Sequence, residues 1–318
     1  MRKLLTLLFV SFLAITTLDA KRLGVEFWGT KGDADATFMQ LTTELKDSLG
    51  FVVSDPHPKI NMGYVQAFGS TTLDNLGFFS IANDEKLRSL LTQYPALGGF
   101  SPFNLHIFKK KTEDITWVGH LRPEVMADIV GLTDVKLRKE FLSMFSGLDK
   151  KVISDMDSKY VTNIYFDSLP EKPMMEFVYK FDRDEIEDIE TFVEEFQETY
   201  EETFEDAGYL IAGYKNFKEN YDFAGKDFTA FDAYFVYSLC HFPFSNGIFN
   251  DVPEAGIFAP CSVYMYIKAD SNELHIGMPK LANWVKVANI TDAEKIKMIN
   301  DLDAEIISIL EEMGAELQ

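Results

Sequence analysis

Cysteine, tryptophan and histidine are scarce in this chain of 318 residues, which contains two, three and five of them. Basic residues are outnumbered, with 30 Lys and Arg against 51 Asp and Glu and a net charge of −21. Nucleic-acid binding requires basic side chains that displace counterions from phosphates, so this composition argues against a nucleic-acid partner. Two cysteines also exclude a fold held together by several disulfides.

Recognisable catalytic and cofactor motifs are missing as well. The sequence has no Gly-rich phosphate loop, no nucleophile-elbow serine, no His-Glu-x-x-His and no Rossmann fingerprint. The many carboxylates of residues 182–206 follow the spacing of a solvated helix face and need no catalytic role. We therefore favour a protein without enzymatic activity and expect no cofactor.

Residues 1–20 have the pattern of a secretory signal. Arg2 and Lys3 precede an apolar run that is too short to span a bilayer, and Ala20 is a small residue suited to cleavage. We expect a secreted or periplasmic mature chain, cleaved near Ala20 and without a further membrane span. Leu18 stands where a small side chain is usual before a cleavage site, so a leader retained as an anchor is the alternative.

The mature sequence contains an internal repeat with a constant offset of 158 residues. The offset pairs identical residues: Ser80 with Ser238, Pro95 with Pro253, Gly98 with Gly256, Phe100 with Phe258, and Pro102 with Pro260. It also aligns the helix-ending Gly50 with Gly208 and the helix-opening Thr133 with Thr291. We predict a first repeat at 21–155, a linker at 156–173 and a second repeat at 174–318.

Each repeat has the order strand, helix, several strands and closing helix. In the first repeat we expect strands at 23–28, 51–53, 64–68, 103–109 and 115–118, and helices at 38–49, 84–94 and 133–148. This order predicts an α+β fold with antiparallel sheets covered by helices on one face. The two uncovered faces can bury each other as an internal pseudo-dimer, and so we expect a monomeric chain.

The second repeat resembles the domain of unknown function 302 family. The resemblance is carried by Leu239-Cys240-His241-Phe242-Pro243, by Pro260-Cys261 and by Gly277-Met278-Pro279. The first repeat keeps Pro102 and Arg122-Pro123 but has Ala82 and Phe103 at the cysteine positions. The resemblance implies a TATA-box-binding-protein-like α+β unit in two copies. It implies no reaction, because the activity of the family is not established.

Cys240 and Cys261 lie at the end of one predicted strand and the start of a later one. This pair of cysteines is consistent with three interpretations: a disulfide, two buried free thiols, or a thiol-redox or soft-metal site. A metal site would add His275, although the spacing matches no closed zinc motif.

The aromatic surplus offers a different candidate site. Aromatic residues make up 14% of the chain and gather in the second repeat. We predict that a small apolar ligand or a protein partner binds at the sheet faces, through Tyr234, Tyr237, Phe242, Phe244, Tyr264 and Tyr266. An alternative function is thiol-redox or soft-metal handling by Cys240 and Cys261. A further possibility is that the acidic helix at 185–207 docks a basic partner.

Overall fold

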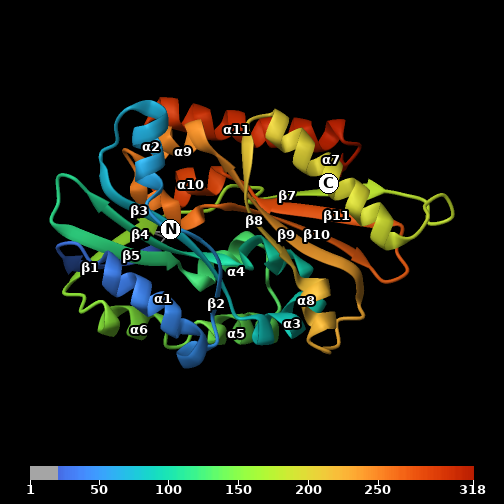
Figure 1. The fold of residues 1–318 in the computed structure, drawn as a ribbon, viewed down its shortest axis with the longest axis horizontal. Helices are drawn as coiled ribbons and strands as arrows, with labels where there is room; N and C mark the ends of the chain where they lie inside the picture. Colours follow the sequence, from blue (N-terminus) through green and yellow to red (C-terminus); the bar gives the residue numbers. More distant parts are fainter. Residues whose placement is uncertain (1–20) are drawn as a thin grey trace, which may run out of the picture.

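The computed structural model describes residues 21–318, and the predicted leader lies outside them. The first half consists of β1 (Arg22–Lys31), α1 (Asp35–Leu49), β2 (Val52–His57), α2 (Ile60–Phe68), β3 (Leu73–Ala82), α3 (Asp84–Gln93), the 3-10 turn η1 (Pro95–Phe100), β4 (Phe103–Lys110), β5 (Ile115–Leu121), α4 (Pro123–Ile129), α5 (Val135–Met144), α6 (Leu148–Asp155) and β6 (Tyr160–Phe166) (Figure 1).

The second half follows without a break in the described chain. It consists of β7 (Met174–Lys180), α7 (Ile189–Asp206), β8 (Tyr209–Asn216), α8 (Phe217–Phe223), β9 (Phe231–His241), α9 (Phe242–Phe249), the 3-10 turn η2 (Pro253–Phe258), β10 (Cys261–Lys268), β11 (Glu273–Pro279), α10 (Ala282–Val287), α11 (Ala293–Glu312) and β12 (Glu316–Leu317). Among residues 21–318, no helix combines the length and the apolar character needed to cross a bilayer.

The strands form two six-stranded antiparallel sheets. The first has the order β2-β3-β4-β5-β1-β6, and the second, read from its far edge, has the order β8-β9-β10-β11-β7-β12. The predicted α+β class is confirmed. In both sheets the opening strand of the half lies fifth and a later strand is added outside it. A repeated unit predicts this shared strand order. That the first half is a copy of the same family's domain stays a prediction.

Two helices show how the sequence encodes the outer layer. In α1, Phe38, Leu41 and Leu45 recur every three or four residues and are buried, and Gly50 ends the helix in the left-handed conformation with φ 77°. In α7, Phe192, Phe196, Tyr200 and Phe204 are buried and four residues apart. The acidic residues between them therefore face solvent, as predicted.

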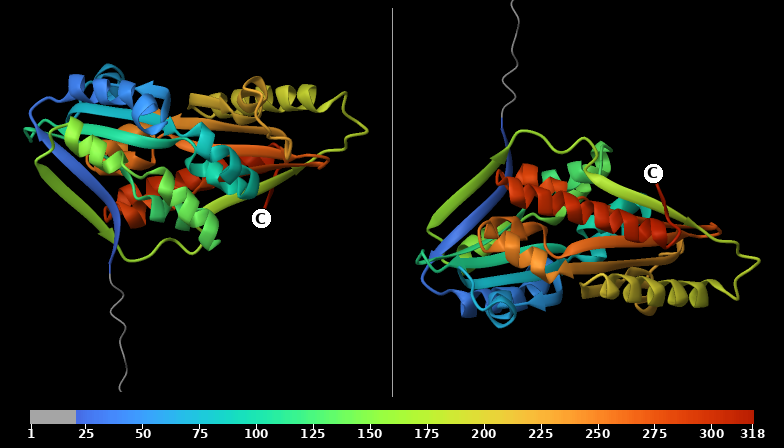
Figure 2. Two further views of the ribbon diagram at one scale, coloured as in Figure 1. Left: turned by 90° about the horizontal axis from the view of Figure 1, so that it is seen from below. Right: turned by 90° about the horizontal axis from the view of Figure 1, so that it is seen from above.

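The two halves meet at a seam, where the 3-10 turn of each half covers strands of the other half's sheet. Turn η1 packs on β10 and turn η2 packs on β4. Tyr234 donates a hydrogen bond to the Pro95 carbonyl at 2.5 Å, and the His106 Nε2 atom lies 2.8 Å from the Pro253 carbonyl. Figure 2 shows most strands of both halves in the middle of the molecule with helices on either side, and β1 and β6 at one end.

Three expected elements differ from the structure. The helix expected at 133–148 is two helices, α5 and α6, which are separated at Gly147 with φ 93°. Residues 64–68, expected as a strand, belong to α2, because Ile60, Tyr64 and Phe68 are four residues apart and place the buried Tyr64 against Phe242, with ring centroids 5.1 Å apart. The segment 156–173, expected as a linker, contains β6, which pairs with β1. Its run of aromatic and β-branched residues favours a strand.

Candidate functional site

The six aromatic residues predicted to bind a ligand do not gather at one place. Tyr234 and Tyr264 are buried in the seam, whereas Tyr237 lies on the opposite face of β9, where its ring centroid is 4.9 Å from that of Tyr200 on α7. Phe242 and Phe244 belong to α9. Tyr266 stacks on His275 with ring centroids 4.8 Å apart. These rings are occupied by protein contacts.

The seam also lacks the space that a ligand would need. A cavity at the seam, lined by Pro102, Asn104, Pro260 and Ser262, holds about 20 Å³. A second cavity, inside the second half and lined by Cys240, Phe244 and Cys261, holds about 30 Å³. Each volume suits about one water molecule. The two sheets fill the place that the sequence suggested for an apolar ligand.

Cys240 and Cys261 are free in the structure. Strands β9 and β10 run antiparallel, but Cys261 pairs with Leu239, so Cys240 is one residue out of register and belongs to the opposite face of the ladder. This geometry explains why no disulfide forms between them. Burial raises the pKa of the Cys240 thiol to about 11 and also raises the pKa of Cys261. Protonated thiols are poor nucleophiles and poor metal ligands.

The structure corrects the suggested metal set. His275 pairs with Tyr266 on β10, and five residues of extended strand separate Tyr266 from Cys261. At about 3.3 Å per residue, this separation puts His275 well outside the reach of a metal bound at the cysteine. Within the described part of the chain, no group of three or more His, Cys, Asp or Glu side chains could hold a metal ion.

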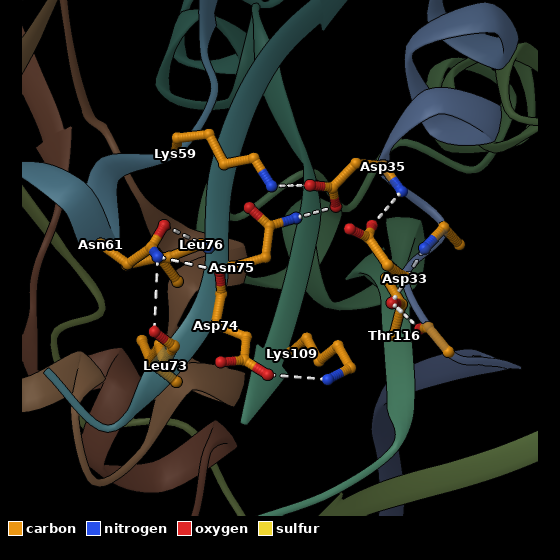
Figure 3. Close-up of polar contacts among 12 residues, drawn as sticks. Asp33, Asp35, Lys59, Asn61, Leu73, Asp74, Asn75, Leu76, Lys109 and Thr116 are labelled. Carbon is orange, nitrogen blue, oxygen red and sulfur yellow. Dashed lines mark hydrogen bonds and ion pairs between the residues drawn. The ribbon is translucent and has the colours of Figure 1, made fainter. Parts of the chain in front are cut away.

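A polar cluster in the first half is satisfied by its own members (Figure 3). The buried Asn75 donates to Asp35 at 2.5 Å, and Asp35 also pairs with Lys59. The Asn61 amide donates to the Asp74 carbonyl at 3.0 Å and its oxygen accepts from Leu76 N at 3.1 Å. These contacts attach α1 and α2 to β3. We assign the cluster a structural role.

An open groove lies where β7 ends, beside α7, and its volume is about 580 Å³. Its apolar lining comes from the strand end, the connection after it, the helix and the end of α11: Tyr179, Phe181, Ile186, Phe192, Phe196 and Met313. The rings are held in place by one another. Phe181 stacks on Phe192 with centroids 4.3 Å apart, and Tyr179 meets Phe196 edge to face at 5.3 Å. The aromatic floor is therefore formed before any ligand arrives.

The rim of the groove is acidic. Asp182 and Glu185 on the connection and Glu195 on α7 line it, and all three are exposed. Lys180 also lines the groove, and its ammonium is paired with Glu316 at 2.8 Å. Within residues 21–318, none of the three carboxylates has a basic side chain at ion-pair distance. The groove thus combines an aromatic floor with an excess of carboxylates at its rim.

The groove was not among the sites suggested by the sequence. Tyr179 and Phe181 are predictable as strand residues, and Phe192 and Phe196 as the apolar face of a helix. The signal that could have revealed the groove is the acidic connection 182–188, which separates two aromatic stretches. Only the packing of α7 against the end of β7 brings those stretches together.

Residues 188–313, in the second half of the chain, match the model of the family described as Domain of unknown function DUF302. This confirms the resemblance seen at Cys240, Pro260 and Gly277. A solved structure described as an uncharacterized conserved protein DUF302 from Bacillus stearothermophilus is 18% identical and aligns with a TM-score of 0.34. It covers 44% of this chain and 96% of its own. Comparison with curated proteins gives no match.

Proposed function

We propose that the mature protein is a non-enzymatic binding protein, exported behind its leader, and that its site is the groove between β7 and α7. The ligand has an apolar body and a positively charged group. The body lies on the rings of Phe181, Phe192 and Phe196, and the charge lies among the carboxylates of the rim. This proposal replaces the seam with the groove as the binding site.

The contrast in volume between groove and seam carries the proposal. Small-molecule sites generally occupy about 300–1,000 Å³ and combine an apolar lining with a few polar groups. The groove, at about 580 Å³, lies within this range, whereas the seam cavity holds about 20 Å³ and the cavity beside the cysteines about 30 Å³. A ligand of more than a few atoms can enter the groove without separating the two sheets.

The chemistry of the lining supports a cation. Aromatic faces attract positive charge, and the guanidinium carbon of Arg183 already lies 5.9 Å from the centroid of the Phe181 ring. Arg183 itself is held away from the groove by an ion pair with Asp232. The net charge of −21 adds a long-range attraction for cations and a repulsion for anions.

Isothermal titration calorimetry with three probes of equal chain length tests the proposal. The probes are decyltrimethylammonium, the neutral decyl maltoside and the anionic decyl sulfate, each below its micellar concentration. We expect the cationic probe to bind most tightly and its affinity to fall as salt is added. Equal or tighter binding of decyl sulfate, or no binding of any probe, would exclude this site.

Charge-reversal variants locate the binding. Glu185→Lys and Glu195→Lys place positive charge at the rim and should weaken the cationic probe about tenfold, since a loss of ~1.4 kcal/mol corresponds to one decade. Glu202→Lys makes the same change on an exposed part of α7 outside the groove and is the matched control. An equal loss in the control would instead favour the whole acidic helix as a docking surface for a basic protein.

A further inference from the structure

Strand β6 leaves one edge of the first sheet open. It is the last strand in the order β2-β3-β4-β5-β1-β6 and pairs only with β1. The inner edges of the two sheets, β2 and β8, contact each other, and the His57 Nε2 atom lies 2.5 Å from the Ala212 carbonyl. In both views of Figure 2, β6 is the outermost strand at the end of the molecule away from the β7 and α7 connection.

The edge is unprotected by the usual means. Proteins guard exposed edge strands with charged residues, proline or very short strands. The far edge of the second sheet follows this rule, because β12 has two residues and includes Glu316. The seven residues of β6, Tyr-Val-Thr-Asn-Ile-Tyr-Phe, include no charge and no proline. Tyr160, Val161 and Tyr165 are 43%, 59% and 44% exposed.

We propose that β6 pairs with β6 of a second copy of the chain, antiparallel about a two-fold axis at Asn163. This register places Tyr160 opposite Phe166, Val161 opposite Tyr165 and Thr162 opposite Ile164. Aromatic pairs and aromatic pairs with β-branched residues are favourable across antiparallel strands. The first sheet of one copy and the first sheet of the partner subunit then form one continuous sheet, and the open β6 edge of each copy is covered.

The flanking charges fit the same register. A two-fold axis at Asn163 places Lys159 of one copy opposite Asp167 of the partner subunit, four residues on either side of the centre. Both side chains are exposed, at 67% and 74%, and each has an exposed ion-pair partner in its own chain, Asp157 at 2.6 Å and Lys21 at 4.0 Å, which it would exchange or share. Two opposite-charge pairs therefore flank an uncharged strand. Because each chain has a net charge of −21, most other surfaces would repel a second copy.

One backbone group of the strand is already engaged. The Asn289 amide donates to the Tyr165 carbonyl at 2.8 Å. A carbonyl oxygen has two lone pairs, so this contact leaves one acceptor site at that position. In the proposed register Tyr165 lies opposite Val161 of the partner subunit, so its carbonyl would have to accept with this second site.

Sedimentation velocity of the mature chain across a concentration series tests the proposal. We expect a reversible dimer. Val161→Lys adds a charge to the edge without entering the monomer core and should shift the protein to monomer. Phe223→Lys is the matched control, because Phe223 is 96% exposed at the end of α8, and it should leave the dimer unchanged. A wild-type monomer throughout, or a dimer that survives Val161→Lys, overturns the proposal.

The register itself is tested by exchanging the flanking charges. Asp167→Lys places lysines opposite one another and should weaken the dimer, whereas the double variant Lys159→Asp with Asp167→Lys restores opposite charges and should recover it. Asn163→Cys sets two thiols face to face at the two-fold axis and should form an intermolecular disulfide under oxidation. Tyr160→Cys, which faces Phe166 of the partner subunit, should not. The opposite pattern would exclude this register.

Discussion

The two halves of the molecule share their strand order but differ where the first strand connects to the first helix. Three residues, 32–34, join β1 to α1, whereas eight, 181–188, join β7 to α7. In the first half Thr116 holds the short connection, because its hydroxyl donates to Gly32 O at 2.6 Å and accepts from Ala34 N at 3.3 Å. The residue 158 positions later is Leu274, which cannot make these bonds.

This difference accounts for the groove beside α7, whereas the pocket beside α1 that Asp35 and Phe38 line holds about 40 Å³. The short connection brings the start of α1 against the sheet, whereas the longer, acidic connection separates the strand end from α7 and leaves the aromatic floor open. A shared strand order therefore allows different surface sites, since the length and chemistry of a connection can change without altering the sheet.

The largest expected effect comes from the seam, where both halves place a glycine. A Cβ at Gly98 would lie 2.5 Å from the Cβ of Tyr264, and one at Gly256 would lie 2.6 Å from the ring of His106. We expect Gly98→Ala to lower the free energy of unfolding by about 3 kcal/mol, and Gly256→Ala by less, because a side-chain ring moves more easily than a Cβ.

Chemical denaturation measures both seam variants. Gly225→Ala is the control, because Gly225 has φ 63° and open space around it, so that variant reports backbone strain alone, about 1 kcal/mol. A Gly98→Ala variant no less stable than this control would show that the halves are not tightly packed.

The second prediction concerns His106, which occupies the position of Tyr264 in the other half. Its ring nitrogens face two carbonyls, Gly77 O at 3.0 Å and Pro253 O at 2.8 Å, and a neutral imidazole can donate to only one. Complete burial among Phe78, Phe108 and Phe27 outweighs the second hydrogen bond and lowers the pKa of His106 to about 4. The unfolded chain therefore binds a proton at higher pH than the folded protein.

The contribution of His106 to the free energy of unfolding is therefore fully present above pH ~6.5. It declines as the pH falls toward 4, by about 3 kcal/mol in all. Burial of Asp303 raises its pKa to about 6, which gives an opposite slope in the same range. The difference in unfolding free energy between wild type and His106→Gln across this range isolates the histidine. If the wild-type protein gained stability relative to the variant on acidification, His106 would instead be protonated in the folded protein and donate hydrogen bonds to both carbonyls.

A third prediction exchanges the connections between the halves. Replacing residues 181–188 by the short Gly-Asp-Ala of the first half should remove Phe181, Asp182 and Glu185 from the groove and lower the affinity for decyltrimethylammonium at least about tenfold. Calorimetry measures the affinity, and a thermal melt checks that the fold persists. Undiminished binding in a folded graft would place the site elsewhere.

The smallest effect is expected at the cysteines, whose counterparts in the first half are Ala82 and Phe103. Cys240→Ala should change the unfolding free energy by about 1 kcal/mol or less, since the side chain is small and partly buried. Both thiols of the native protein should react slowly with a thiol reagent at pH 7 and quickly once unfolded. Rapid labelling of the native protein would revive the redox alternative.

The sequence by itself determined the long helices and several of the strands. The spacing of apolar residues and the capping residues are local features of the sequence. They locate α1, α7 and the closing helix α11, which Asp292 caps. The offset of 158 residues in the sequence aligns the residues of β4 with those of β10, and the residues of η1 with those of η2. Residues 64–68 were misassigned because a short aromatic stretch fits both periods, and the neighbouring strand β3 decides between them.

Tertiary structure alone decided the candidate site. Whether Tyr234 lines a pocket or fills a seam depends on the distance between two sheets, and no local pattern reports that distance. The pairing register of Cys240 and Cys261 depends in the same way on how β9 and β10 align. The groove arises from Tyr179 and Phe196, which are distant in sequence and meet only when α7 packs against β7. Local chemistry determines secondary structure, whereas long-range packing determines which aromatic surfaces remain open.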